Sequence, residues 1–192
     1  MTNQDFTTSF TSKNETMNKP DEKKQGMRVR TVVTGHNAKG RAVFVRDEQV
    51  DGMPIPGLGE LALLWNANEP AIYPNPGNNP AAPGIFPPIG GVRFLVGTYL
   101  PNGVVAPAPT PEMHLEDGDG PGGANDGFHR TDTTDFGIVI SGHLAVQLDD
   151  GAEEVLSPGD VLIENGTRHR FRVVGDVPAT MASFIIGARR QQ

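Results

Sequence analysis

The last third of the chain is a series of short apolar runs separated by turns rich in glycine and aspartate. These runs, which follow Thr133, are TDFGIVISG, HLAVQLDDG, AEEVLSPGD, VLIENG, TRHRFRVVGD and ATMASFIIGA. Their spacing is nearly regular, and no helical period separates them. Such a pattern predicts an all-β protein, either a sandwich or a small barrel, with jelly rolls among the candidates.

The first half of the chain also favours strands. The runs VRTVVTGH and RAVFVRD are joined by NAKG, which predicts a hairpin. Residues 65–91 are dense in proline, asparagine and glycine, and repeated prolines exclude a helix there. A loop of this length predicts either a lid over a pocket or an arm lying on a partner subunit. The next strand, GGVRFLVGTYL, places Arg93 and Tyr99 on one face.

Composition suggests one domain with a tail. Residues 1–26 are polar and lack apolar periodicity, so we expect a disordered tail. Residues 27–190 fit a single domain whose core barrel spans about 90–187. The N-terminus lacks the apolar core of a signal peptide, and no run of about 18 apolar residues occurs. We therefore expect a cytoplasmic protein without membrane contacts.

Charge and cysteine content exclude several classes of function. The formal net charge is −7 and no Lys/Arg cluster is interleaved with aromatic residues, which excludes nucleic acid as an expected partner. The chain has no cysteine, so disulfides, thiolate zinc sites and a cysteine nucleophile are excluded. Any metal must be held by histidine, carboxylate or water.

Two segments place polar side chains on strand faces that point inward. In HRTDTTDFGIVISG, residues 129–142, the side chains of His129, Thr131 and Asp135 share a face. Further on, His169 shares a face with Phe171 and an apolar valine. A buried imidazole and a buried carboxylate are costly unless they are paired or bind a cation. The pattern therefore predicts either a metal site or a hydrogen-bonded polar plug.

The region from about 128 to 187 resembles the cupins. The first cupin motif is G(x)5HxH(x)3-4E(x)6G, and His129, Thr131, Asp135 and Gly142 fall in its spacing. The stretch SPGDVLIENGTRH is similar to the second motif, with His169 one residue early. Thr131 replaces the second histidine of the first motif, and Asp135 replaces its glutamate. The resemblance implies a double-stranded β-helix, a jelly-roll barrel with an N-terminal strand pair.

The resemblance also implies ligands. Cupins hold one divalent metal, which implies that His129, Asp135 and His169 are ligands here for iron, zinc, manganese or nickel. His114 is either a fourth ligand or a loop histidine. Thr131 occupies a ligand position that it cannot fill directly. Three protein ligands leave open positions for a substrate or oxygen.

Other residues are candidates for substrate contact. We expect such contacts from Arg93, Tyr99, Thr131 and Phe171. Arg93 is either a bidentate partner of a substrate carboxylate or an ordinary surface arginine. We also expect a homodimer, because a partner's N-terminal strand pair would cover the open edges of a small barrel.

Three functional hypotheses follow. The first is a metal-dependent cupin enzyme acting on a small oxygenated molecule, such as an oxo acid, enol or phenol, by dioxygenase, decarboxylase, isomerase or cyclase chemistry. The second is a metal-independent dehydratase or cyclase in which Asp135 and His169 are the acid and base. The third is a small-ligand-binding cupin without catalysis. Fold alone does not decide among them.

Overall fold

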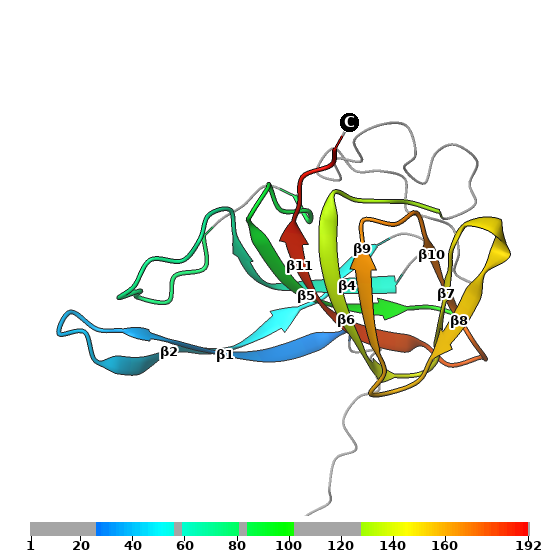
Figure 1. Ribbon diagram of the computed structural model, residues 1–192. Coiled ribbons are helices and arrows are strands. Elements are labelled where there is room, and N and C mark those ends of the chain that lie inside the picture. Colours follow the sequence, from blue (N-terminus) through cyan, green and yellow to red (C-terminus); the bar gives the residue numbers. More distant parts are fainter. Residues whose placement is uncertain (1–25, 56–58, 81–83, 102–127, 192) are drawn as a thin grey trace, which may run out of the picture.

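The computed structural model describes residues 26–55, 59–80, 84–101 and 128–191 (Figure 1). In these residues the regular structure consists of β-strands and one short 3-10 helix, Asp149–Gly151, so the all-β prediction is confirmed. The described part of the chain contains no helix long and apolar enough to cross a membrane. The expected tail, apart from Gly26, lies outside the described residues.

Most of the described strands belong to one six-stranded antiparallel sheet. Its order is β3-β4-β5-β11-β6-β9. The strands are β3 (Met53–Ile55), β4 (Gly59–Ala67), β5 (Val92–Tyr99), β6 (Thr133–Ser141), β9 (Val161–Asn165) and β11 (Ala179–Gly187).

A three-stranded sheet faces it across a hydrophobic core. Its order is β10-β7-β8, from β7 (Leu144–Gln147), β8 (Glu153–Leu156) and β10 (Arg170–Val173). Val139 and Met181 of the larger sheet pack with Leu144 and Val173 of the smaller one. This double-sheet barrel is the expected jelly-roll arrangement, and β6 and β9 bring the two cupin-like motifs side by side.

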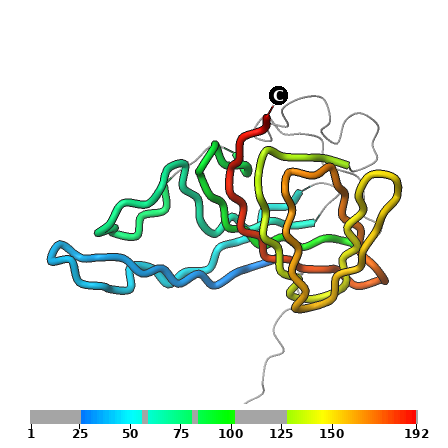
Figure 2. The backbone as a smooth tube through the Cα atoms, viewed as in Figure 1, coloured from blue at the N-terminus to red at the C-terminus, as the bar shows by residue number. Residues whose placement is uncertain are grey.

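The N-terminal strands form an arm. Strands β1 (Arg28–His36) and β2 (Ala42–Asp51) pair with each other within the chain, as the hairpin prediction requires. The base of this hairpin packs Val29 and Val50 against the outer side of the larger sheet. Its tip extends away from the barrel beside the loop after β4 (Figures 1 and 2), where the amide of His36 donates to the carbonyl of Asn75 at 2.7 Å.

Two expected boundaries differ from the structure. Trp65, Asn66 and Ala67 extend β4, so the proline-rich loop begins at 68 rather than at 65. A register shift between Leu63 and Trp65 allows β4 to remain paired with β5 up to Val92, the first residue of β5. The sheet also includes β3 and β4, and therefore starts well before residue 90.

The turn at Gly142 fixes the register after β6. Its φ of 70° lies in the left-handed region, and a Cβ there would stand 2.5 Å from the carbonyl oxygen of Pro178. Only glycine fits this close approach. The turn is where the sequence comparison with cupin motifs had placed it.

Candidate active site

Acidic side chains meet on the inner face of the larger sheet. Asp135 of β6 lies directly opposite Glu164 of β9 in the strand register. Glu164 is buried, and His169 lies just after the turn that follows β9. The His169 Nδ1 is 2.5 Å from the Glu164 Oε1. Asp135, Glu164 and His169 are called the acid–histidine cluster below.

His129 joins this cluster through the backbone. The amides and carbonyls of His129 and His169 form two reciprocal hydrogen bonds of 2.9 Å. Their ring centroids lie 4.3 Å apart. The structure therefore brings together His129, Asp135 and His169, the three residues that the sequence motifs singled out.

Asp135 has an unusual electrostatic environment. Burial raises the pKa of its carboxyl from 3.8 to about 6; a hydrogen bond from Thr133 and the charge of His169 oppose this rise, and the charge of Glu164 adds to it. Its Oδ1 has no hydrogen-bond partner among the described residues and no contact with solvent. Asp135 therefore changes protonation near neutral pH.

The surroundings of His169 favour its protonated form. Burial lowers the pKa of its imidazole, but the Glu164 carboxylate, the Thr167 carbonyl and Asp135 together outweigh burial and raise it. Nδ1 lies 3.0 Å from the carbonyl oxygen of Thr167, an acceptor, so the proton on Nδ1 points there. The buried Glu164 Oε1 consequently forms an ion pair without an aligned hydrogen bond.

Aromatic rings form a wall beside the cluster. Phe171 lies 5.0 Å from the His169 ring and 5.5 Å from the Tyr99 ring, between centroids. Burial raises the pKa of Tyr99, and the charges of Glu164 and Asp135 raise it further. The Tyr99 phenol thus stays protonated. The predicted substrate contacts Tyr99 and Phe171 do lie next to the predicted acid and base.

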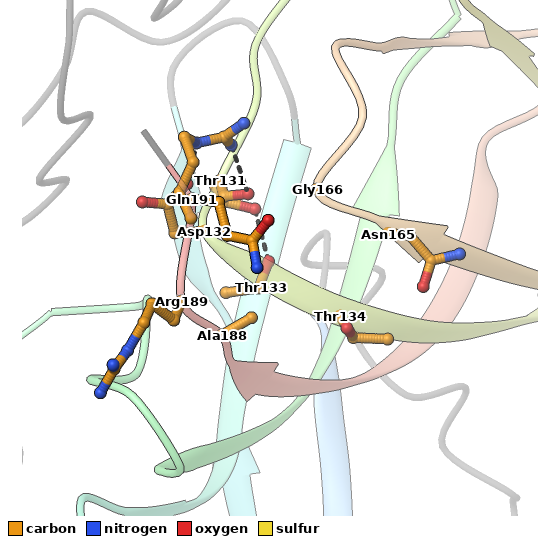
Figure 3. A pocket seen from close by; sticks show the side chains of 10 residues that line it. Thr131, Asp132, Thr133, Thr134, Asn165, Gly166, Ala188, Arg189 and Gln191 are labelled. Atoms are coloured by element: carbon orange, nitrogen blue, oxygen red, sulfur yellow. Dashed lines mark hydrogen bonds and ion pairs between the residues drawn. The ribbon is translucent and has the colours of Figure 1, made fainter.

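Thr131 links the cluster to a cavity at the end of the sheet. Its Oγ1 is 2.5 Å from the Oγ1 of Thr133, which in turn bonds Asp135. Figure 3 shows the cavity, which has a volume of about 370 Å³. Its lining consists of Thr131, Asp132, Thr133, Thr134, Asn165, Gly166, Ala188, Arg189, Arg190 and Gln191.

Arg93 lies on the inner face but has a different role. Its guanidinium is fully buried and donates to the carbonyls of Gly84, Ala67 and Val92 and to the Asn68 Oδ1, at 2.8 to 3.3 Å. These acceptors are neutral and belong to the ends of the proline-rich loop. The structure places Arg93 as the anchor of that loop and not on the molecular surface. Its predicted contact with a substrate stays a prediction.

Sequence reasoning missed Glu164. In the run VLIEN, alternation suggests that Val161 and Ile163 point inward, which would leave Glu164 outside. The structure has the opposite arrangement, with Val161 and Ile163 exposed and Glu164 buried. One signal was available: Glu164 and His169 flank the turn 165–168 symmetrically, which places their side chains near each other.

A protein site for a metal ion brings at least three donor side chains together. Within the described ranges, no three His, Asp or Glu residues are arranged to hold one. Nδ1 of His169 is already engaged by Thr167 and Glu164. A metal would need a further donor, and the predicted one, His114, lies outside the described residues. The assignment of His129, Asp135 and His169 as ligands stays a prediction.

Residues 116–185 match the family model described as "Cupin domain". The match identifies a cupin domain in the second half of the chain. One similar cupin is the cupin-domain-containing oxidoreductase fogC of Aspergillus ruber, 26% identical over 165 residues that cover 80% of this chain and 70% of that protein.

Two further matches extend the comparison. The phomopsin biosynthesis cluster protein D of Diaporthe leptostromiformis is 29% identical to this cupin over 153 residues, covering 73% of this chain and 68% of that protein. Among solved structures, KdgF from Halomonas sp. matches with a TM-score of 0.40 and 14% identity. That match covers 73% of this chain and 89% of the other.

Proposed function

We propose that this cupin is an enzyme that transfers protons on a small oxygenated organic substrate, with Asp135 and His169 as acid and base and Glu164 as the partner of His169. The observation that carries the proposal is the convergence of these three titratable groups on the inner face of the barrel. Active sites are where burial and close charges shift pKa values in this way. The relatives' description as oxidoreductases supports an enzyme in general.

The protonation states suit a dehydration, isomerisation or cyclisation. Above pH 6 Asp135 is mainly ionised and accepts a proton from a carbon next to a carbonyl group. His169 donates a proton to the departing or rearranging oxygen. Because Nδ1 faces Thr167 and Glu164, that proton leaves from Nε2.

Neighbouring groups prepare the two catalytic residues. Glu164 stabilises the imidazolium of His169, and Thr133 holds the Asp135 carboxylate by its second oxygen. Tyr99 and Phe171 give the substrate an apolar wall with one phenol donor. Such positioning and proton transfer together accelerate reactions by large factors.

The test uses proton exchange and does not need the natural substrate. Protein treated with EDTA is incubated in D₂O with a panel of small oxo acids, hydroxy acids and phenols, and deuterium uptake or loss of water is followed by NMR. Asp135→Asn should slow the reaction about 10²- to 10⁴-fold. Glu154→Gln, an exposed carboxylate on β8, is the matched control for Glu164→Gln and should have no effect. Equal rates in all three variants would contradict the proposal.

A metal-dependent reaction is the second candidate. It is favoured by the buried Asp135 Oδ1 and Glu164 Oε1, two carboxylate oxygens without hydrogen-bond partners in the described chain. A bound divalent metal would polarise a substrate oxygen. Elemental analysis of protein purified without chelator distinguishes the two. Stoichiometric iron, zinc, manganese or nickel, with exchange lost in EDTA and restored by that metal, would favour the second candidate.

A further inference from the structure

Ser183 interrupts the apolar inner face of β11. On either side of it along that face, Met181 belongs to one hydrophobic cluster and Ile185 belongs to another. Ser183 is only 7% exposed, and among the described residues its hydroxyl has no hydrogen-bond partner. A nearly buried hydroxyl without a partner is unfavourable in a protein interior. The position therefore indicates a role other than packing.

The Tyr99 phenol lies next to Ser183. Its ring leans back over Gly97, since a Cβ at Gly97 would stand 3.6 Å from the ring and 3.8 Å from the phenol oxygen. Gly97 pairs with Met181 and Ser183 pairs with Leu95, so Gly97 and Ser183 are diagonal neighbours on β5 and β11. The phenol likewise makes no hydrogen bond within the described part of the chain. Two hydroxyl donors thus lie close together on the inner face of the larger sheet.

Asp135 shares the interior with these two hydroxyls. It pairs with Ile185, and Ser183 precedes Ile185 by two residues on the same face, so the Cβ atoms of Asp135 and Ser183 are roughly 7 Å apart. The Asp135 Oδ1 has no hydrogen-bond partner in the described chain. Burial, the charge of Glu164 and the charge of Asp135 raise the pKa of the Tyr99 phenol, so the phenol and both carboxylates face one interior. An acceptor therefore stands near two donors, at a spacing that one small functional group spans.

We infer that Ser183 and Tyr99 bind the carbonyl oxygen of the substrate and stabilise the enolate that Asp135 generates. This inference rests on the proposed function. Asp135 takes the proton from the carbon next to the carbonyl group, the C–H electron pair forms a C=C bond, and the π pair of the carbonyl moves to its oxygen. That oxygen accepts hydrogen bonds from both hydroxyls, which bind an anion more strongly than a neutral carbonyl. The substrate class is accordingly a ketone, aldehyde or oxo acid with a proton on the adjacent carbon.

The surrounding charges make such donors necessary. Glu164 is a buried carboxylate, and a negative charge that develops on the substrate in the same interior is repelled by it. Asp135 becomes neutral as it takes the proton, so the negative charge moves to the substrate oxygen and the total charge does not change. The raised pKa of Tyr99 keeps its phenol protonated, and therefore a donor. Phe171 packs against the Tyr99 ring, with 5.5 Å between centroids, and restricts its orientation.

Binding of a phenolate tests the site without any turnover. 4-Nitrophenolate resembles an enolate, because its charged oxygen is attached to an unsaturated carbon, and its colour distinguishes it from the neutral phenol. In EDTA-treated Asp135→Asn protein, which lacks the competing carboxylate, the bound probe should be the yellow phenolate at a pH where the free probe is the phenol. Adding Ser183→Ala or Tyr99→Phe should weaken phenolate binding at least about tenfold.

Matched controls separate the two hydroxyls from general effects. Ser141→Ala changes an exposed serine at the end of β6, and Tyr73→Phe changes the only other tyrosine of the chain, which is 73% exposed. Both should leave phenolate binding unchanged. Nitrobenzene lacks the phenol oxygen and should bind equally to all variants. Circular dichroism and melting curves confirm that each variant folds.

Proton exchange distinguishes this inference from the proposed function. With a substrate that exchanges, Ser183→Ala should lower kcat about 10²-fold with KM nearly unchanged, and Ser183→Thr, which keeps a hydroxyl, should stay within about tenfold of the parent. Phenolate binding that needs both hydroxyls supports the oxygen site even where Asp135→Asn leaves exchange unchanged, a result that contradicts only the proposed function. Equal phenolate affinity with and without the two hydroxyls would overturn the inference, and so would the absence of phenolate binding to Asp135→Asn protein.

Discussion

The inner and outer faces of the same strands reverse the usual distribution of residues. Inside, β5, β6 and β9 carry Arg93, Asp135 and Glu164, all charged side chains. Outside, the same strands carry phenylalanine, isoleucine and valine with no charge in the described positions. Charges inside a barrel and apolar groups outside are both unfavourable for an isolated protomer. Each departure therefore indicates a requirement other than protomer stability.

The inner charges themselves fall into two kinds. Arg93 is surrounded by neutral carbonyl acceptors that hold one loop in place. Glu164 is paired with an ionisable imidazole, and Asp135 and Glu164 each retain one oxygen without a hydrogen bond among the described residues. The hydrogen bonds of Arg93 are complete, which is typical of a structural residue. The carboxylates of Asp135 and Glu164 lack hydrogen bonds, which is typical of groups in a binding or catalytic site.

The largest expected effect on stability comes from replacing Arg93, whose guanidinium is fully hydrogen-bonded. Arg93→Met leaves three carbonyls and the Asn68 side chain without a donor, so the free energy of unfolding should fall by about 4 kcal/mol. Urea denaturation measures it. Arg172→Met, an exposed strand arginine, is the control and should change stability by less than about 1 kcal/mol. Equal effects of the two substitutions would mean that Arg93 does not anchor the loop.

The second prediction concerns Asp135 and the pH dependence of the free energy of unfolding. The pKa of Asp135 is about 6 in the folded chain and near 3.8 unfolded, so the folded state binds more protons between these values. Stability should therefore fall by up to about 3 kcal/mol as pH rises from 4 to 6. The raised pKa of His169 acts in the same direction, and its contribution is lost at higher pH, as pH passes its folded value.

Asp135→Asn isolates this effect. The variant should lose the decrease between pH 4 and 6 and be more stable than the parent at pH 7, while proton transfer slows about 10²- to 10⁴-fold. Thermal melts at several pH values, with Glu154→Gln as the control, measure the difference. A parent protein whose stability rises from pH 4 to 6 by the same amount as Asp135→Asn would contradict the assignment. Higher stability combined with lost activity is the expected signature of a catalytic carboxylate.

The comparison of the two faces also explains what could be predicted from the sequence. Period-two alternation and Gly-Asp turns were enough for the all-β fold. Motif spacing singled out His129, Asp135 and His169; His129 and His169 lie side by side, while their predicted roles remain predictions. Glu164 could not be found by alternation, because that rule assumes that apolar residues point inward. On β9 they point outward, where Val161 and Ile163 are exposed.

The substrate contact of Arg93 stays a prediction, but the structure shows a role in holding the loop that strand parity did not indicate. Strand parity correctly placed Arg93 and Tyr99 on one face, but they lie at opposite ends of β5. Arg93 lies in the same cross-strand row as Asp135, with Ile185 of β11 between them, yet its guanidinium donates to the carbonyls of the loop. A period-two pattern predicts on which face of the sheet a side chain lies. It does not predict which groups that side chain contacts, because those contacts come from distant parts of the chain, such as Gly84 and Asn68 for Arg93.

The smallest expected effect is the salt dependence of a dimer contact through the uncharged outer face of the larger sheet. The homodimer expected from the sequence, if held by Phe136, Phe184 and Ile163, has no ion pair to screen, whereas the two chains repel each other through their net charge of −7. Raising NaCl from 50 to 500 mM should therefore tighten the dimer slightly, by less than about threefold, and changing pH from 6 to 8 should have a similarly small effect. Sedimentation equilibrium at each salt concentration measures the Kd.

A Kd that rises tenfold with salt would instead indicate a charged interface. The candidates for it are the arginine–aspartate pairs of the arm, Arg28 with Asp51 and Arg30 with Asp47. The sign of the salt effect thus decides whether the sheet face or the charged side of the arm holds the two copies together.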